Sequence, residues 1–215
     1  MTAPRPMPDS APVVLIHGLW YGRISLKPMA ARLARKGWAV DRFAYATVRR
    51  SIDSNAASLS EFLRRYRPNE PVHLVGHSLG GLVALHMIEH FDVPAARLVL
   101  LGSPVNGSTV AHRLGRLGPL KRLVGRAAGP LEAAGRRAPE SWEVGVVAGT
   151  QGLGAGRLIA SLPRPHDGTV AETETRLDGE TDRLLLPVSH TGLVLSPAVA
   201  AAVDRFLEHG RFGAS

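Results

Sequence analysis

The sequence of 215 residues contains no cysteine. This absence excludes a disulfide framework and a thiolate metal site, and it agrees with a reducing compartment. Aromatic residues make up only 5% of the chain, and no basic stretch is interleaved with them. The basic residues are mostly arginine and are scattered. Nucleic-acid binding is therefore not expected, although the formal net charge is +8.

The chain also lacks a long apolar run. No stretch approaches the ~18 residues of a membrane span. The first residues, MTAPRPMPDSAPVV, contain no continuous apolar segment of the kind that a signal peptide needs. We therefore expect a cytoplasmic protein in which residues 1–11 form a flexible arm. The remaining chain is long enough to bury a sizeable core, and we expect residues 12–210 to form a single domain.

What the chain does contain is a series of short apolar runs that alternate with amphipathic segments. The first run, PVVLI, is typical of a strand buried on both faces. The expected strands are residues 12–16, 38–44, 72–75, 97–101, 142–148 and 184–186. The expected helices are residues 25–36, 53–66, 79–90 and 196–208, with Ser25 and Ser196 as N-caps. This alternation predicts an α/β fold: a mostly parallel sheet of about six strands with helices on both faces.

One serine lies between glycines where the third expected strand meets a helix. Gly76-His77-Ser78-Leu79-Gly80 fits the pattern G-x-S-x-G, in which a sharp turn strains the serine backbone and lifts its hydroxyl above the sheet. Side chains two residues before and after the serine would collide in so tight a turn. The start of the next helix favours an oxyanion at the same point. Ser78 is therefore the candidate nucleophile, and the alternative is a glycine-rich turn with a solvated serine.

A serine hydroxyl is a weak nucleophile unless a base takes its proton. His190 follows the last expected strand, in PVSHTG. The carboxyl ends of parallel strands converge on one crevice, so the loop of His190 can meet the turn of Ser78. His77 is expected to point away because it is adjacent to the serine. Five other histidines are expected in the core or at the surface: His73, His86, His90, His112 and His209.

The base in turn needs a carboxylate that fixes its tautomer and stabilises the imidazolium. Asp167 lies in HDGTV, between the fifth expected strand and His190, and gives the chain order Ser, Asp, His. An ordinary Asp-Gly turn is the alternative reading of this segment. About eighteen residues (149–166) separate that strand from Asp167, which is longer than a tight acid-bearing turn. Three other carboxylates stay open as rivals: Asp182 first, then Asp178 and Glu172.

Acyl transfer also requires two donors for the oxyanion that forms at the substrate carbonyl. The backbone N–H of Leu79, directly after the serine, is one candidate. The second is the N–H of Leu19, in the segment HGLW after the first expected strand. Gly18 lets this loop turn closely, and His17 is expected to brace the loop rather than to react.

Taken together, these motifs resemble the α/β-hydrolase family. IHGLW, VGHSLGGLVA, LLGSPVNGS, HDGTV and VSHTGL follow the family's order over nearly the whole chain. GHSLGG with GSPVNGS and DGTV is similar to compact bacterial lipases and to lipase-like domains related to GPI inositol-deacylases. The resemblance implies the α/β-hydrolase fold and hydrolysis of a carboxylic ester through an acyl-serine intermediate. It implies no metal and no organic cofactor. The first hairpin of the family's fold has no counterpart before residue 12.

The substrate implied is a small or lipid-like ester. The same groups serve an acyltransferase or an amidase, so these activities stay open. A binding module that keeps the fold and the residues without catalysis is the alternative of a different class.

Residues 105–140, which we call the cap segment, lie where the family keeps its cap. Their apolar residues recur at roughly helical spacing among basic ones: Val110, Leu114, Leu117, Leu120, Val124 and Leu131. A basic amphipathic segment of this kind can contact an anionic membrane surface weakly. Helices that pack on the core and expose their arginines to solvent are the alternative.

Overall fold

The computed structural model describes residues 11–68, 70–116, 121–153 and 161–213. All of the expected arm except Ala11 lies outside these ranges. Among the helices that they contain, none combines the length and the apolar character that crossing a membrane requires.

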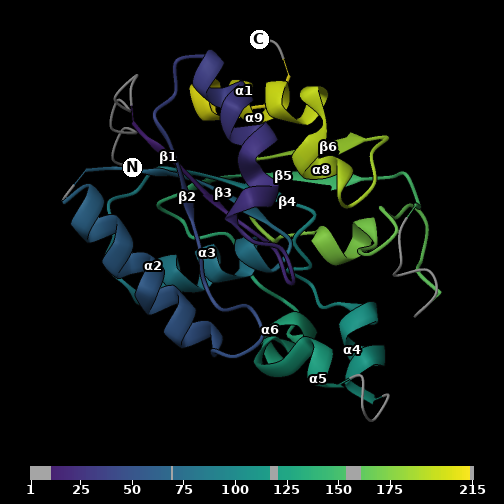
Figure 1. The fold of residues 1–215 in the computed structure, drawn as a ribbon. Coiled ribbons are helices and arrows are strands. Elements are labelled where there is room, and N and C mark those ends of the chain that lie inside the picture. The colour runs from purple at the N-terminus through teal and green to yellow at the C-terminus, as the bar shows by residue number, and fades with distance from the viewer. Residues whose placement is uncertain (1–10, 69, 117–120, 154–160, 214–215) are drawn as a thin grey trace.

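Six parallel strands form one sheet, in the order β2-β1-β3-β4-β5-β6 (Figure 1). The strands are β1 Val13–Ile16, β2 Val40–Phe43, β3 His73–His77, β4 Arg97–Leu101, β5 Glu143–Gly149 and β6 Asp182–Leu186. Each pair of neighbouring strands runs in the same direction. The predicted α/β-hydrolase fold class is confirmed, and the described sheet is parallel throughout.

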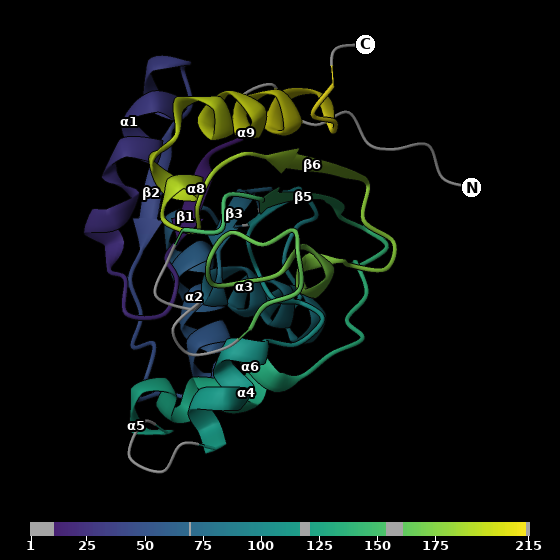
Figure 2. The same ribbon diagram turned by 90° about the vertical axis from the view of Figure 1, so that its right-hand side faces the viewer.

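Helices cover both faces of the sheet, as Figures 1 and 2 show from two directions. One face carries α1 Lys27–Arg35, α8 Gly192–Leu195 and α9 Pro197–His209, with the short 3-10 helix η1 Arg23–Leu26. The other face carries α2 Ile52–Tyr66 and α3 Leu79–His90. Beyond them lie α4 Thr109–Arg116, α5 Lys121–Val124, η3 Gly125–Ala127 and α6 Ala128–Glu132. A further 3-10 helix, η4 Glu172–Thr175, interrupts the long segment between β5 and β6.

Alternation along the strands divides the buried side chains between two cores. In β1, Val14 and Ile16 belong to the core beneath α2 and α3, whereas Val13 and Leu15 belong to the core beneath α1 and α9. Both sets are fully or almost fully buried. Successive strand side chains point to opposite faces, so a strand covered on both sides needs an unbroken apolar run. This requirement explains why the continuous run PVVLI was a reliable strand signal.

The start of the first helix differs from the prediction. Ser25 is not an N-cap, because its hydroxyl donates to the carbonyl of Gly22 (2.8 Å) inside η1. The α-helix begins two residues later, with Pro28 in its first turn, where the fixed φ of proline fits and its missing N–H costs nothing. By contrast, Ser196 does cap α9, since its side chain accepts a hydrogen bond from the N–H of Ala198 (3.2 Å).

The described part of the cap segment consists of short helical pieces against the larger core. Val110, Leu114, Val124 and Leu131 are buried in the same cluster as the apolar side chains of α3. Leu117 and Leu120 lie outside the described residues. The apolar side chains that can be placed therefore serve packing.

Candidate active site

Ser78 occupies the turn between the last residue of β3 and the first residue of α3. Its backbone is strained, with φ of 53° and ψ of −123°, a region that a residue with a side chain rarely adopts. Its N–H donates to the carbonyl of Leu101 (2.9 Å), at the carboxyl end of the neighbouring strand β4. The side chain is partly exposed. The turn thus presents a hydroxyl at the carboxyl edge of the sheet.

The two motif glycines allow close contacts of different kinds. A methyl group at Gly76 would lie 2.4 Å from the Cα atom of Gly81, across the turn itself. A methyl group at Gly80 would instead lie 2.4 Å from the carbonyl oxygen of Ile16 in β1. Gly76 therefore keeps the turn tight, as the sequence indicated. Gly80 lets α3 approach the backbone of the adjacent strand.

The loop after β1 lies directly against the serine turn. A methyl group at Gly18 would be 3.0 Å from the Cβ atom of Ser78 and 3.0 Å from Nδ1 of His77. Leu19 follows Gly18 in this loop, and Leu79 opens α3, where its N–H has no acceptor within the helix. The two predicted backbone donors thus lie on the two chain segments that flank Ser78.

His17 holds the same loop in place. Its Nδ1 lies 3.0 Å from the carbonyl oxygen of Gly18, and its Nε2 accepts the N–H of Tyr45 (3.4 Å). The Tyr45 ring stacks on the imidazole at 4.5 Å, and the Tyr45 hydroxyl donates to the His17 carbonyl (2.8 Å). Burial lowers the pKa of His17, and the contact with the Gly18 carbonyl offsets part of this effect. A neutral imidazole with these contacts braces the loop, and the sequence offered no sign of Tyr45.

Asp167 and His190 form a buried pair. His190 Nδ1 lies 2.6 Å from Asp167 Oδ2, and the backbone N–H of His190 donates to the carbonyl of Asp167 (2.9 Å). The other carboxylate oxygen, Oδ1, accepts the N–H groups of Thr169 (2.9 Å) and Val170 (2.7 Å). The Asp-Gly turn and the carboxylate partner are therefore the same feature, since the turn supplies the donors that orient the carboxylate.

Opposing effects act on the pKa of Asp167. Burial, the largest effect, raises the pKa, whereas the charge of His190 and the hydrogen bonds from His190, Val170 and Thr169 lower it. The lowering effects together prevail, and the pKa lies below its usual value. Asp167 is therefore a carboxylate at neutral pH that can stabilise a positive charge on His190.

Two glycines outside the motif bring this pair to the edge that carries Ser78. A methyl group at Gly102, directly after β4, would lie 3.1 Å from Asp167 Oδ2 and 3.2 Å from His190 Nδ1. One at Gly149, the last residue of β5, would lie 2.8 Å from the Cβ atom of Asp167. Neither glycine belongs to the G-x-S-x-G pattern. Their positions could have indicated the close approach, because each glycine lies where a strand ends at the predicted crevice.

Between the described residues, no hydrogen bond connects Ser78 Oγ with His190. Hydrogen bonds at catalytic sites are often long without substrate and shorten in the reacting complex. Ser78 and His190 nevertheless both lie against the end of β4. The Ser78 N–H donates to the carbonyl of Leu101, and a methyl group at Gly102 would lie 3.2 Å from His190 Nδ1.

His77, which the sequence places next to the serine and predicts to point away from it, packs against His190. Its Nε2 is 3.1 Å from the backbone carbonyl oxygen of His190, and the two rings are 4.7 Å apart. Burial and the charge of His190 lower the pKa of His77 to about 3, so the ring is neutral and donates to the carbonyl. Tyr21 packs edge-on against His77, and its hydroxyl bonds to the Thr191 hydroxyl (2.8 Å). These contacts fix the loop that carries His190.

The rival carboxylates have other partners. Asp182 is the first residue of β6, at the amino-terminal ends of the strands, whereas His190 follows β6 at their carboxyl ends. The Asp182 carboxylate accepts the N–H of Phe212 (2.6 Å). Asp178 pairs with Arg137 (3.1 Å), and Glu172 pairs with Arg176 and Arg183. Of the four carboxylates considered, Asp167 is the one that the structure brings to His190.

The fold and the site define an α/β protein in which a strained strand-to-helix serine and an Asp–His pair share one edge of a parallel sheet. The chain belongs to the alpha/beta hydrolase family, whose family model matches residues 13–211. A comparison with curated proteins finds no match.

Several solved structures share this fold. The mature lipase BlEst2 of Bacillus licheniformis is 20% identical, with a TM-score of 0.70 over 90% of each chain. The metagenomic carboxyl esterase MGS0156 is 19% identical, with a TM-score of 0.72 over 95% of this chain and 79% of its own. The RedJ thioesterase of Streptomyces coelicolor is 21% identical, with a TM-score of 0.55 over 97% of this chain and 89% of its own. At such identities the likeness shows the fold alone.

Proposed function

We propose that this protein is a serine hydrolase that cleaves carboxylic esters, with Ser78 as nucleophile, His190 as general base and Asp167 as the orienting carboxylate. The observation that carries the proposal is the 2.6 Å contact between His190 and Asp167 at the sheet edge that presents the strained Ser78. Lipases and carboxyl esterases among the solved structures of this fold support the choice of small or lipid-like esters.

The reaction begins when Ser78 Oγ attacks the ester carbonyl carbon and passes its proton to His190 Nε2. The carbonyl π electrons move to oxygen, and the N–H groups of Leu19 and Leu79 stabilise the resulting oxyanion. When this intermediate collapses, the alcohol leaves with the proton from His190, and the acyl group stays on Ser78. Water then repeats the sequence, with His190 as base, and releases the carboxylic acid.

Active-site labelling tests the assignment. A fluorophosphonate probe should label the wild-type chain, and Ser78→Ala should abolish labelling and lower the turnover of p-nitrophenyl esters by about 10⁶. Ser58→Ala, a partly exposed serine on α2, is the matched control and should be labelled normally. Circular dichroism shows whether each variant is folded.

Labelling of folded Ser78→Ala at another serine would contradict the choice of nucleophile. A folded wild-type chain that neither reacts with the probe nor cleaves esters of any chain length would contradict the proposed activity and favour a binding module.

A further inference from the structure

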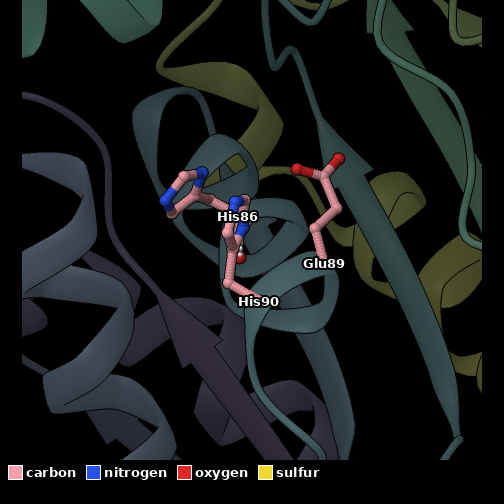
Figure 3. A group of neighbouring side chains, drawn as sticks. All are labelled: His86, Glu89 and His90. Atoms are coloured by element: carbon pink, nitrogen blue, oxygen red, sulfur yellow. Dashed lines mark hydrogen bonds between the residues drawn. The ribbon is translucent and has the colours of Figure 1, made fainter.

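A cluster of metal-ligating side chains occupies the last turns of α3. His86, Glu89 and His90 each offer one ligand atom, and these atoms all lie within 4.8 Å of one another. In Figure 3 the two imidazole rings lie next to each other, and the Glu89 carboxylate lies to one side of them. At 1.5 Å per residue, His90 lies about 17 Å along the helix from Leu79. The cluster is therefore separate from the candidate active site.

The chemical types in this cluster match a zinc ligand set. Two histidines and one glutamate are ligands that Zn²⁺ binds with a water in the fourth position. The spacing His-x-x-Glu-His is one with which a helix supplies two imidazoles to zinc. Histidines four residues apart lie on one helix face. The two rings are stacked here, with centroids 4.0 Å apart, so one ring must rotate before both in-plane lone pairs point at the same ion.

Each imidazole already has an oxygen partner at one of its nitrogens. His86 Nε2 lies 2.8 Å from Asp53 Oδ1, and His90 Nδ1 lies 2.9 Å from the His86 carbonyl oxygen. Donation of N–H to these oxygens leaves a lone pair on the opposite ring nitrogen. Histidines that bind metals almost always have such a partner, which fixes the tautomer and the ring orientation.

The position of the cluster also favours a cation. His90 is the last residue of α3, and the C-terminal end of a helix carries partial negative charge. Glu89 and His90 are exposed, so an ion can reach them from solvent. Zinc bonds of about 2.0–2.2 Å require tetrahedral ligand atoms about 3.4 Å apart. The three ligand atoms lie within 4.8 Å of one another, and rotation of the exposed Glu89 and His90 side chains can bring them to this spacing.

We propose that His86, Glu89 and His90 bind Zn²⁺ or a similar divalent transition metal ion, with Asp53 as the positioning residue for His86. Because Asp53 lies in the first turn of α2, the site connects the start of α2 to the end of α3. Imidazole ligands favour zinc, copper and nickel over the oxygen-seeking Mg²⁺ and Ca²⁺. The ion stabilises the packing of these helices and takes no part in the proposed ester cleavage.

Calorimetry on the untagged full chain, freed of metal with EDTA, tests the proposal. ZnCl2 should bind with one high-affinity ion per chain and raise the unfolding temperature, whereas MgCl2 should do neither. His90→Gln should weaken zinc binding at least tenfold, and Asp53→Asn should weaken it about 10- to 100-fold. His209→Gln is the matched control, since His209 is also an exposed histidine beside a glutamate at the end of a helix.

The proposal is overturned if the wild-type chain takes up no zinc at millimolar concentration. It is also overturned if His90→Gln, shown to be folded by circular dichroism, binds zinc as tightly as wild type. Equal weakening by His90→Gln and His209→Gln would equally count against it, because zinc would then bind surface histidines without distinction. None of these measurements uses ester hydrolysis, so they stand whether or not the proposed function is correct.

Discussion

The histidines at the carboxyl edge of the sheet differ in their surroundings. His17 and His77 are buried, and burial lowers the pKa of each, so both are neutral braces for backbone carbonyls. His190 differs because a carboxylate lies at its Nδ1. A proton accepted at Nε2 therefore gains a negative partner at the opposite side of the ring.

This difference predicts unequal effects of two amide substitutions. Asp167→Asn should lower the turnover of a p-nitrophenyl ester by about 10⁴, because an amide can hold the wrong tautomer of His190 and cannot stabilise its charge. Asp182→Asn should keep near wild-type turnover, since Asp182 lies at the amino-terminal ends of the strands, away from His190. Steady-state kinetics on both variants measures the contrast. The opposite ranking would mean that Asp167 is the wrong carboxylate.

The same substitution has a pH-dependent effect on stability. The pKa of Asp167 is below its ordinary value of 3.8 in the folded chain. The carboxylate therefore contributes stability above that ordinary value, and the contribution is lost as pH falls through the lower folded pKa. Urea unfolding should show wild type more stable than Asp167→Asn at pH 7, with the difference shrinking below pH 3.8.

At the scale of the elements, the backbones of α3 and β1 come so close at Gly80 that this position has no room for a side chain. A methyl group there would meet the Ile16 carbonyl oxygen at 2.4 Å, and a backbone atom cannot move aside as a side chain can. Gly80→Ala should therefore push α3 away from β1. We expect a loss of about 1–3 kcal/mol in the free energy of unfolding and a loss of turnover, because Ser78 begins the same helix.

A glycine in α6, away from the sheet, is the matched control. Gly129 lies in α6, and a methyl group there would meet nothing within 4 Å. Gly129→Ala should leave stability unchanged or raise it by up to about 1 kcal/mol, because alanine favours a helix. Urea unfolding of the two variants gives the comparison. Equal stability of Gly80→Ala and wild type would show that the close approach is unimportant.

The elements show why much of the fold was predictable from sequence. A strand buried on both faces, such as β1 or β4, must be continuously apolar, and that requirement is local. Caps such as Ser196 are local too. The end of β3 was less visible, because His77 is a buried strand residue whose Nε2 bonds to the carbonyl of His190, 113 residues further along the chain. Composition alone does not reveal such a partner.

In the candidate site, too, features set by neighbouring residues could be predicted, and contacts between distant parts of the chain could not. Ser78 could be found because the strained turn needs glycines within two residues of it. Asp167 could be ranked by chain order, but its contact with His190 depends on a loop of many residues whose course the sequence does not specify. Gly102 and Gly149 escaped notice because each is required by a chain segment far along the sequence, and only the assembled sheet brings those segments together.

On the scale of the whole molecule, the positive charge of +8 is spread over helices on both faces of the sheet. The exposed Arg113 and Arg116 lie on α4 in the cap segment. Arg35 and Arg64 are exposed at the ends of α1 and α2. Figures 1 and 2 show that α4 lies on the side of the molecule away from α1. If the cap segment meets an anionic membrane, these two pairs of arginines should contribute unequally.

We therefore predict that Arg113→Glu with Arg116→Glu weakens binding to phosphatidylserine vesicles on the order of tenfold or more at low salt, because each basic residue near such a surface contributes about 1 kcal/mol. Arg35→Glu with Arg64→Glu changes the net charge by the same amount and should weaken binding less. Co-sedimentation at two salt concentrations measures both variants, and added salt should reduce the difference. Equal weakening by the two pairs would mean that only net charge matters. In that case the cap segment packs on the core through Val110 and Leu114, and its arginines are solvated rather than bound to lipid.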